Sequence, residues 1–280
     1  MGRAADGGSA LSPVASGGLM ATGIRCGHDD AVERMSNGQC RHNPPKLQVY
    51  LLGQISVDDA LYLQRRLAYE ASGAPGRMAA LLLCEHPPAI TIGRAGSRAY
   101  IGPDDETLRR RGIVIRWVNR GGGCWFHMPG QLVAYSIYPL TAMDLGAYRR
   151  GLVEALRGVL CELQVDALEF QRSGYVYSAG HLIAGWGVAV HRRIATHGFW
   201  INVSLSPDRF RILQLKPLNP MKATTIEARR TKPTPMARVR EAVVRHFCGA
   251  LKMDDYFVSA GDHLLNVRLH GDATVTARRT

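Results

Sequence analysis

The sequence predicts an α/β (α+β) protein with a mixed β-sheet and helices packed outside it. Short apolar runs of strand length are interspersed with amphipathic helical segments, and their order is not a strict βαβα repeat. Of the 280 residues, 46% are hydrophobic, which is enough to bury a full core. No internal repeat is visible, so a solenoid is not indicated.

The chain divides by pattern into a tail, one domain and an extension. Residues 1–46 are rich in glycine, serine and alanine and lack apolar periodicity, so we expect a disordered N-terminal tail. Residues 47–255 carry the globular pattern and are expected to form one domain. Residues 256–280 are weakly patterned, and we expect a C-terminal extension of undefined structure.

The cysteines are scattered along the chain, which indicates a reducing compartment and not a disulfide framework. They are Cys26, Cys40, Cys84, Cys124, Cys161 and Cys248. We therefore expect a cytoplasmic protein. Two Cys-x-His pairs lie in the tail, at Cys26/His28 and Cys40/His42. Zinc binding there is an alternative that the tight spacing disfavours.

The net charge of +12 favours acidic partners. Nucleic acid satisfies that charge, but the sequence carries no recognisable aromatic-and-basic nucleic-acid module. No window approaches the roughly 18–20 uninterrupted apolar residues of a membrane span. We expect a monomer that binds neither nucleic acid nor a membrane.

In the first half of the domain, two helices have clear start signals. Ser56 is a plausible N-cap, with Asp58 and Asp59 in the first turn of a helix that ends at the turn beginning at Gly73. A second helix is expected from 103 to 111, with Gly112 at its C′ position. Apolar runs predict strands over 47–52, 79–84, 89–92, 113–118 and 132–138.

The second half has helical spacing over 148–163 and over 236–251, where Val239, Val243 and Phe247 share one face. Residues 224–235 are expected to be a basic connection broken by prolines, and residues 207–213 are ambiguous. Strands are predicted over 174–178, 182–190 and 195–203.

Three blocks stand out for their chemistry. In Glu85–Arg94 and in Arg120–Tyr135, a strand runs into a glycine- or proline-bearing turn that carries an arginine and a histidine. The glycines at 121–123 let the backbone approach a ligand more closely than residues with a Cβ can. A third block joins Gly180–Ala184 to His197–Val203.

Together the blocks resemble the octanoyltransferases of lipoate synthesis, within the biotin/lipoate protein ligase catalytic-domain family. That family carries Glu-His-Pro-Pro followed by Thr-x-Gly-Arg, and Glu85–Arg94 matches throughout. Its second motif is Arg-Gly-Gly, four residues, then His-Gly-Pro-Gly-Gln. This chain matches that motif except that Met128 stands in place of the glycine that follows the histidine. Its third is Gly-x-Lys-Ile-Ala leading to His-Gly-x-x-x-Asn-Val. Three ordered motifs are a specific signal.

The resemblance implies a function and a site. It implies transfer of an octanoyl group from acyl carrier protein through an enzyme cysteine to a lysine of a lipoyl domain, without cofactor or metal. Arg94 and Arg120 are expected to clamp the pantetheine phosphate or acidic partner residues, or else to pair with an internal carboxylate. The substrate-binding residues that the matching motifs imply are His86, Arg94, Arg120, Gly121, Gly122, Gly130, Gln131, Ala184, Gly185, His197 and Gly198.

The chain departs from the family at the two catalytic positions. The family lysine aligns with Leu182 and the family cysteine with Leu218, and no cysteine lies between Cys161 and Cys248. One hypothesis is a relocated nucleophile, Cys124, with His127 as its partner. It requires a bulge, because residues three apart on a strand face opposite sides. Other candidate bases are Lys216, Lys222, His181 and His197.

Two further readings remain open. One is a catalytically impaired relative that binds acyl chains, acyl carrier protein or lipoyl domains without transfer. The other is an ATP-dependent lipoate or biotin ligase, which the leucine at 182 also disfavours because those enzymes use a lysine near that position.

Overall fold

A computed structural model of the protein describes residues 45–73, 78–141, 143–206, 223–230, 232–261 and 264. Residues 1–44 of the expected tail 1–46 lie outside the described residues, as do both Cys-x-His pairs and the ambiguous segment 207–213. Lys46, the last residue of the expected tail, already belongs to a strand. Leu218, Lys216 and Lys222 also lie outside them.

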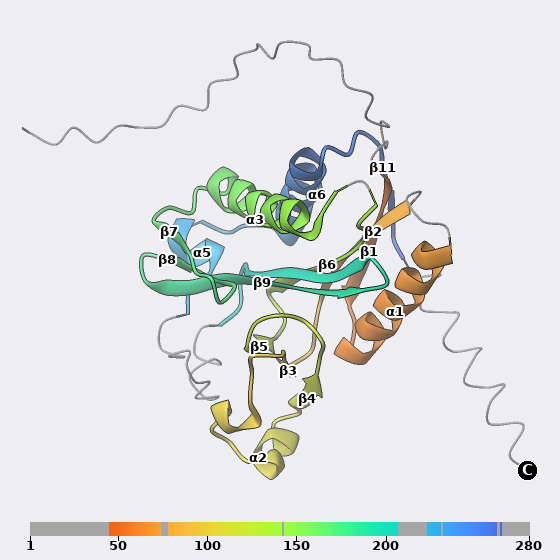
Figure 1. Ribbon diagram of the computed structural model, residues 1–280. Helices are drawn as coiled ribbons and strands as arrows, with labels where there is room; N and C mark the ends of the chain where they lie inside the picture. Colours follow the sequence, from red (N-terminus) through yellow and green to blue (C-terminus); the bar gives the residue numbers. More distant parts are fainter. Residues whose placement is uncertain are drawn as a thin grey trace, which may run out of the picture. The chain divides into compact units, whose positions relative to one another are not determined.

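A large mixed sheet forms the centre of the fold (Figure 1). It has eight strands in the order β11-β1-β2-β6-β10-β9-β8-β7. Strand β1 pairs in parallel with β2 and β11, and the other pairings are antiparallel. The strands are β1 (Lys46–Gln54), β2 (Met78–Glu85), β6 (Gln131–Pro139), β7 (Leu168–Phe170), β8 (Tyr175–Ser178), β9 (His181–His191), β10 (Ile194–Asn202) and β11 (Tyr256–Ser259). The prediction of a mixed α/β sheet is confirmed.

A second, three-stranded sheet has the order β4-β3-β5. Strand β3 (Ala89–Ile92) pairs in parallel with β4 (Val114–Trp117) and antiparallel with β5 (Cys124–His127). This small sheet carries the first two sequence blocks and therefore positions the candidate site.

Helices cover the large sheet on both faces (Figure 1). Helices α3 (Leu145–Glu162) and α6 (Met236–Leu251) pack together on one face, while α1 (Val57–Gly73) and the small sheet lie on the other. Two short helices are α2 (Asp105–Arg110) and α5 (Ile226–Arg230). Among the described helices, none is long and apolar enough to cross a membrane.

Side-chain caps hold the starts of two helices, one of them the cap expected at Ser56. The Ser56 hydroxyl accepts a hydrogen bond from the Asp59 amide at 3.0 Å, which satisfies one of the unpaired donors of the first turn of α1. The Asp104 carboxylate does the same for the Thr107 amide at 2.7 Å, at the start of α2. Gly112 follows α2 in the left-handed region with φ +67°, as its predicted C′ position requires.

Strand β6 separates two cores, because successive side chains point to opposite faces. Leu132 and Ala134 belong to the core beneath α3 and α6. Val133, Tyr135 and Ile137 belong to the core that α1 covers. The candidate site lies on the α1 side.

Five described elements were not predicted as such, one of them the short 3-10 helix η1 (Arg98–Tyr100). Strand β5 falls inside the glycine block, and β7 is only three residues long. Helix α5 forms within the basic connection, where the Thr225 hydroxyl accepts from the Ala228 amide at 3.1 Å. Strand β11 lies in the expected extension but pairs with β1 through Tyr256–Ser259, so the sheet continues beyond residue 255.

Candidate functional site

The first two sequence blocks are joined by backbone hydrogen bonds beyond the end of β3. The amides of Gly93, Arg94 and Ala95 donate to the carbonyls of Gly123, Arg120 and Gly122, respectively. These bonds are 3.0, 3.0 and 3.1 Å long. A Cβ on Gly93 would lie 2.5 Å from the Gly122 oxygen, so only glycine allows this approach.

The histidines of the two blocks meet. The rings of His86 and His127 are both buried, and their centroids are 5.3 Å apart in an edge-to-face arrangement. The first two blocks therefore come together at this pair of histidines.

His86 is fixed through both ring nitrogens. Nδ1 lies 2.7 Å from the Ile55 carbonyl oxygen, which only accepts, so Nδ1 carries the proton. Nε2 is then an acceptor, and it accepts a hydrogen bond from the Tyr135 hydroxyl at 2.9 Å. Burial lowers the pKa of His86 to about 4, so the ring is neutral at pH 7.

His127 belongs to a second network with the same tautomer. Its Nδ1 lies 2.8 Å from the Oε1 atom of Gln131, whose Nε2 donates to Phe126 and Asn202. Its Nε2 lies 3.1 Å from the hydroxyl of Thr91. Burial also lowers the pKa of His127 well below its usual value. Neither histidine therefore has an unoccupied ring nitrogen in this arrangement.

Arg120 is a buried cation held by neutral acceptors. Its Nη1 donates to the carbonyls of Gly121 and Gly123, each at 3.0 Å. Its Nη2 donates to the carbonyl and hydroxyl of Thr91, at 2.9 and 2.8 Å. Burial lowers the pKa of Arg120 to about 9, because a charge away from water is destabilised. The expectation that Arg120 clamps a ligand phosphate does not fit this placement, because the guanidinium faces its own loop.

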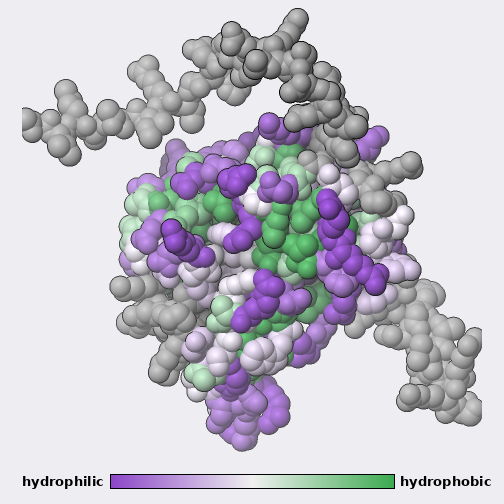
Figure 2. Space-filling model, viewed as in Figure 1, coloured by the Kyte–Doolittle hydropathy of each residue, from purple (hydrophilic) through white to green (hydrophobic). Residues whose placement is uncertain are grey.

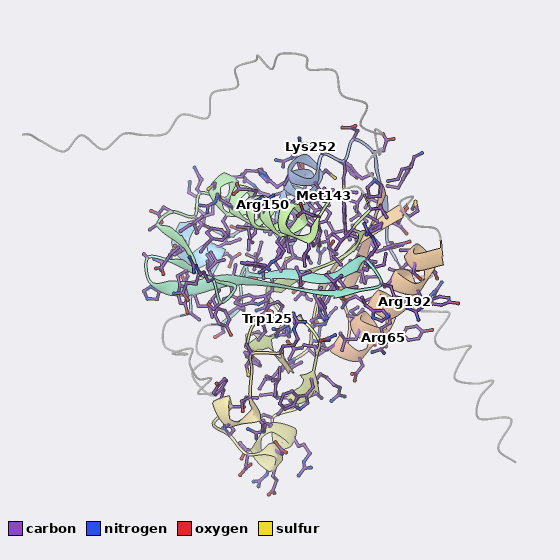
Figure 3. The ribbon with its side chains drawn as sticks, viewed as in Figure 1. Arg65, Trp125, Met143, Arg150, Arg192 and Lys252 are labelled. Carbon is purple, nitrogen blue, oxygen red and sulfur yellow. The ribbon has the colours of Figure 1, made fainter. Side chains whose placement is uncertain are left out.

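An apolar cluster occupies the neighbouring space. Leu182, at the position of the family lysine, is buried in one core with Trp125 and Trp200. The two indoles meet edge to face, 6.2 Å apart, and the Arg120 guanidinium lies 3.3 Å from the Trp125 ring centre. Gly185 makes room for Trp200, because a Cβ there would lie 2.8 Å from the indole. Figure 3 shows Trp125 where the small sheet faces the large one.

Cys124 and His127 do not share a face. Strand β5 pairs with β3 in regular register, without a bulge. His127 and Trp125 face Tyr135 and Trp200, whereas Cys124 and Phe126 pack in the separate core of the small sheet. The Cys124 thiol donates to the Ser97 carbonyl at 3.5 Å, and burial raises the pKa of this thiol. The bulge that would bring the two side chains together is absent from this described strand, and the assignment of Cys124 as nucleophile stays a prediction.

Cys84 is the described thiol nearest to the histidines. Its sulfur lies 3.8 Å from Nε2 of His86, the nitrogen that already accepts from Tyr135. Burial raises the pKa of Cys84 strongly, which disfavours the thiolate.

Little open space remains beside His127. The cavity there has a volume of about 10 Å³, room for one water molecule at most. It is lined by Leu61, Thr91, Val118, Arg120, Trp125, His127, Tyr135 and His197. None of these lining residues is a cysteine.

A separate pocket of about 210 Å³ lies on the other side of the glycine turn. Gly121 and Gly122 line it together with Arg94, Arg149 and Arg172. The three arginines are exposed, and none forms an ion pair with the residues that the structure describes. Arg94 is therefore placed to meet an external anion.

The third block supports the site. The Asn202 amide donates to the carbonyls of Leu182 and Thr224, at 3.4 and 3.1 Å, and so fixes the end of β10. His197 is buried in the left-handed region with φ +65°, and its amide donates to Gln64 at 3.0 Å. A Cβ on Gly198 would lie 2.2 Å from the Ala134 oxygen.

The other residues expected in the site lie in a turn, in a core or away from the histidine pair. Gly130 adopts φ +86° in the turn before β6, where its amide donates to Glu85 at 2.9 Å. Ala184 faces the core beneath α3 and α6, not the site. Met128, in place of the family glycine, is buried in the core of the small sheet. His181 is exposed at the start of β9 and bonds to the Ala179 carbonyl, away from the histidine pair.

Sequence reasoning missed three residues that contact the site. Tyr135 lies two positions from Val133 on the same face of β6, so the strand period places it there. Gln64 is a polar residue on the otherwise apolar face of α1, between Ala60 and Leu67. Thr91 gives no sequence signal apart from its place in the first motif.

The fold is one that solved lipoate protein ligases share. The architecture matches the bipartite lipoate protein ligase of Thermoplasma acidophilum with a TM-score of 0.62 and 19% identity, covering 78% of this chain and 88% of that chain. At this identity the likeness shows the fold alone.

Sequence likeness then gives the family. The model described as the lipoyl protein ligase A/B catalytic domain matches residues 56–248. The octanoyltransferase of Solibacter usitatus is 36% identical over 203 residues, which cover 70% of this chain and 89% of that protein. The octanoyltransferase of Myxococcus xanthus is 32% identical over 211 residues, and the match covers 72% of this chain but 58% of that protein's length. This chain belongs to the lipoyl protein ligase A/B catalytic domain family.

Proposed function

We propose that the protein transfers octanoyl groups in protein lipoylation, from acyl carrier protein to a lysine of a lipoyl domain. The observation that carries this proposal is the gathering of three motifs at one site in a chain 36% identical to an octanoyltransferase. A fold-level likeness alone would not support a substrate.

The route we propose needs no acyl-enzyme. The amine nitrogen of the acceptor lysine attacks the acyl carbon of the donor thioester, and the new C–N bond forms as the C–S bond breaks. The amine proton passes to the departing thiolate, so atoms and charge balance. This route is favoured because the cavity beside His127 has no cysteine among its lining residues and because Leu182 replaces the family lysine. Holding donor and acceptor together lowers the barrier by itself.

The arginines beside the glycine turn give the donor a place to dock. Arg94, Arg149 and Arg172 line the pocket of about 210 Å³ without internal carboxylate partners in the described part of the chain. Guanidinium groups bind phosphate through paired N–H donors. We propose that they receive the phosphate of the carrier's pantetheine arm.

The test is to incubate the full chain with octanoyl-acyl carrier protein and an apo lipoyl domain, and to follow the intact mass of the lipoyl domain. Octanoylation of the acceptor lysine is expected. Arg149→Glu is expected to slow it about tenfold or more, because a charge-assisted contact is replaced by repulsion. Arg109→Glu on α2, which makes the same charge change away from the pocket, serves as the matched control.

A second candidate is binding without transfer. It is favoured by the occupied Nε2 atoms of His86 and His127 and by the buried leucine at 182, which leave no free base in the described site. In that case octanoyl-acyl carrier protein binds but the mass of the lipoyl domain does not change.

A further inference from the structure

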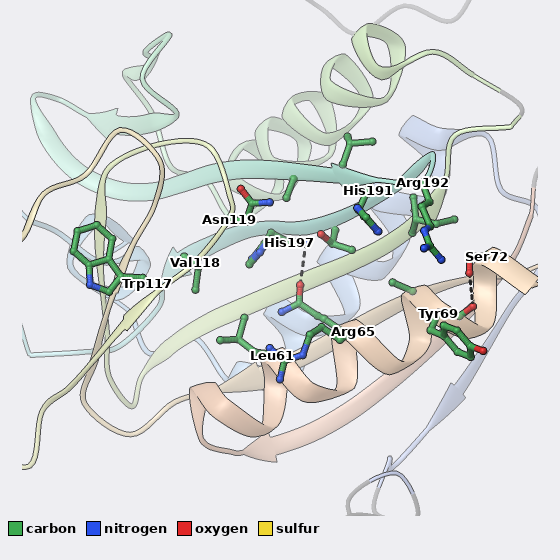
Figure 4. Close-up of a pocket in the computed structure, with 16 residues that line it drawn as sticks. Leu61, Arg65, Tyr69, Ser72, Trp117, Val118, Asn119, His191, Arg192 and His197 are labelled. Carbon is green, nitrogen blue, oxygen red and sulfur yellow. Dashed lines mark hydrogen bonds between the residues drawn. The ribbon is translucent and has the colours of Figure 1, made fainter.

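Two groups of exposed apolar side chains stand out in the described part of the chain. Tyr69, Trp117 and Val190 line the cleft of about 550 Å³ between α1 and the hairpin of β9 and β10 (Figure 4). This cleft adjoins the cavity beside His127, because Leu61 and His197 line both. The first group therefore belongs with the site already described.

The second group is a run of three consecutive residues on β11. Tyr256, Phe257 and Val258 are 49%, 56% and 54% exposed. On the face shown in Figure 2, by comparison, hydrophobic residues gather in the middle and hydrophilic ones border them. Large apolar side chains exposed side by side are typical of an interaction surface.

Strand β11 lies at one edge of the large sheet (Figure 1). It pairs with β1 on one side, and no described strand pairs with its other side. The Leu47 amide of β1 donates to the Asp255 carbonyl at 3.2 Å. The backbone groups of successive strand residues point to alternate sides, so those of Phe257 also face β1. The amides and carbonyls of Tyr256 and Val258 point outward, where another strand can reach them.

The sequence of β11 does not protect this edge. The strand reads Tyr-Phe-Val-Ser and contains neither a charged residue nor a proline. At the opposite edge of the same sheet, β7 carries the exposed Glu169 at its centre. Charged residues on edge strands normally prevent pairing between sheets. Strand β11 therefore has the composition of a strand that accepts a neighbour.

The side chains of β11 divide between the two faces of the sheet. Tyr256 and Val258 stand beside Leu47 and Val49, which belong to the core beneath α3 and α6. Phe257 points to the opposite face. A neighbouring strand with apolar residues at matching positions would therefore cover apolar surface on both faces.

We infer that β11 is the interface for a second copy of this chain, which pairs with it antiparallel about a two-fold axis at Phe257. In this register Tyr256 lies opposite Val258 of the second copy, and Phe257 lies opposite its own counterpart. Tyr256 and Val258 then exchange both N–H···O bonds across the axis. A shift by two residues in either direction places Phe257 opposite Asp255 or Ser259. Only the register at Phe257 pairs all three apolar residues with one another.

The side-chain pairs in this register suit each other. Aromatic–aromatic and aromatic–β-branched pairs across neighbouring strands are stabilising, and Asp255 lies opposite Ser259, so no like charges meet. The paired segment is short, and we expect a weak dimer with a micromolar Kd. This inference departs from the monomer expected from the sequence, and it does not depend on the transfer reaction.

The test is sedimentation velocity of the full chain from about 1 to about 100 µM, a range that brackets a micromolar Kd. Reducing conditions keep the exposed Cys161 from cross-linking two copies. The sedimentation coefficient is expected to rise with concentration from the value of a monomer to that of a dimer. A monomer throughout this range overturns the inference.

Variants at the axis test the register. Phe257→Lys and Phe257→Glu each place like charges opposite one another, and each is expected to weaken the dimer about tenfold or more. An equimolar mixture of the two variants is expected to dimerise more tightly than either alone, because opposite charges then meet. Trp117→Lys, which replaces an exposed aromatic residue of β4, is the matched control and should leave the Kd within about twofold.

A backbone variant tests the hydrogen bonds. Val258→Pro removes an outward N–H but none of the bonds to β1, and proline is tolerated on edge strands. It is expected to weaken the dimer about tenfold or more. Phe257 is exposed, so its variants keep the test informative if Val258→Pro does not fold. Dimerisation that the two Phe257 variants leave unchanged, or a mixture no tighter than either alone, overturns the inference.

Hydrogen exchange distinguishes a second copy from a segment of the same chain as the neighbour of β11. The amides of Tyr256 and Val258 are expected to exchange more slowly as the protein concentration rises. The Phe257 amide faces β1 and is expected to be protected at every concentration. Protection of the Tyr256 and Val258 amides that does not change with concentration would place the neighbouring strand within one chain and overturn the inference.

Discussion

The indoles of Trp125 and Trp200 meet edge to face with centroids 6.2 Å apart, in the same buried core as Leu182. Together with the Arg120 guanidinium they leave only about 10 Å³ beside His127. Side chains of all three motifs are thus packed around His127, and little open space remains among them. The described side chains therefore leave room beside His127 for one water molecule at most.

Removing the Trp200 side chain should destabilise the fold. Trp200 is 1% exposed, so Trp200→Ala leaves a large cavity and is expected to lower the free energy of unfolding by about 3–5 kcal/mol. Urea denaturation measures this change in the free energy of unfolding. Trp117, which is 66% exposed, provides the control, and Trp117→Ala should change stability by no more than about 0.5 kcal/mol. Equal effects would contradict the burial of Trp200 in this core.

Cysteine reactivity should follow burial. Cys161 is exposed on α3, whereas Cys84 is fully buried and Cys124 is 1% exposed. Burial raises the pKa of both Cys84 and Cys124, which lowers their thiolate fractions. Peptide mass spectrometry after brief iodoacetamide treatment is expected to find Cys161 labelled before Cys84 and Cys124. Fast labelling of Cys124 would instead support its assignment as a nucleophile.

Stability should fall on mild acidification. Burial lowers the pKa of His86 from 6.5 to about 4 and that of His197 to about 3. Between about pH 6.5 and about pH 4 the unfolded chain therefore binds more protons than the folded one, and stability decreases as the pH falls. Each histidine contributes roughly 1.4 kcal/mol per pH unit in that window. Urea denaturation across this range measures the slope.

The histidine contribution can be separated with variants. His86→Gln removes one of the titrating groups and is expected to flatten the slope, whereas the exposed His181→Gln should leave it unchanged. A slope that is the same in the wild-type chain and in His86→Gln would contradict the buried, neutral state of His86.

Gly187 fixes the distance between β9 and the glycine turn. A Cβ there would lie 2.6 Å from the Gly121 oxygen, closer than real contacts allow. Gly187→Ala is expected to displace the turn and to lower both the melting temperature and the transfer rate. Gly249→Ala in α6 meets nothing within 4 Å and should raise stability by up to about 1 kcal/mol through helix propensity. A fully active Gly187→Ala protein would show that the close approach is not needed.

The main strands were predictable from sequence because their apolar runs are uninterrupted, as in Ala79–Cys84 of β2. The importance of His86 and His127 was predictable because each lies in a specific motif. Strand β11 was not, since Tyr256, Phe257 and Val258 are exposed at a sheet edge and show no alternation. Its position depends on pairing with β1, which is distant in sequence.

The packing of side chains around the two histidines was harder to predict. Aromatic residues suit a core and a pocket equally, so the sequence did not distinguish these roles for Trp125 and Trp200. The faces of Cys124 and His127 depended on whether β5 bulges, and the regular register with β3 decides this. The sequence shows a leucine at 182 where the family has a lysine, but only the structure places this leucine in the core with Trp125 and Trp200.

The proposed octanoyl transfer proceeds without an enzyme thioester. Its most direct test compares the wild-type chain with a variant in which all six cysteines are replaced by serine or alanine. The measurement is the rate at which the mass of the lipoyl domain increases in the presence of octanoyl-acyl carrier protein. Octanoylation by both proteins is expected, at rates within about threefold of each other. Product from the wild-type chain, but not from a folded cysteine-free variant, would contradict it.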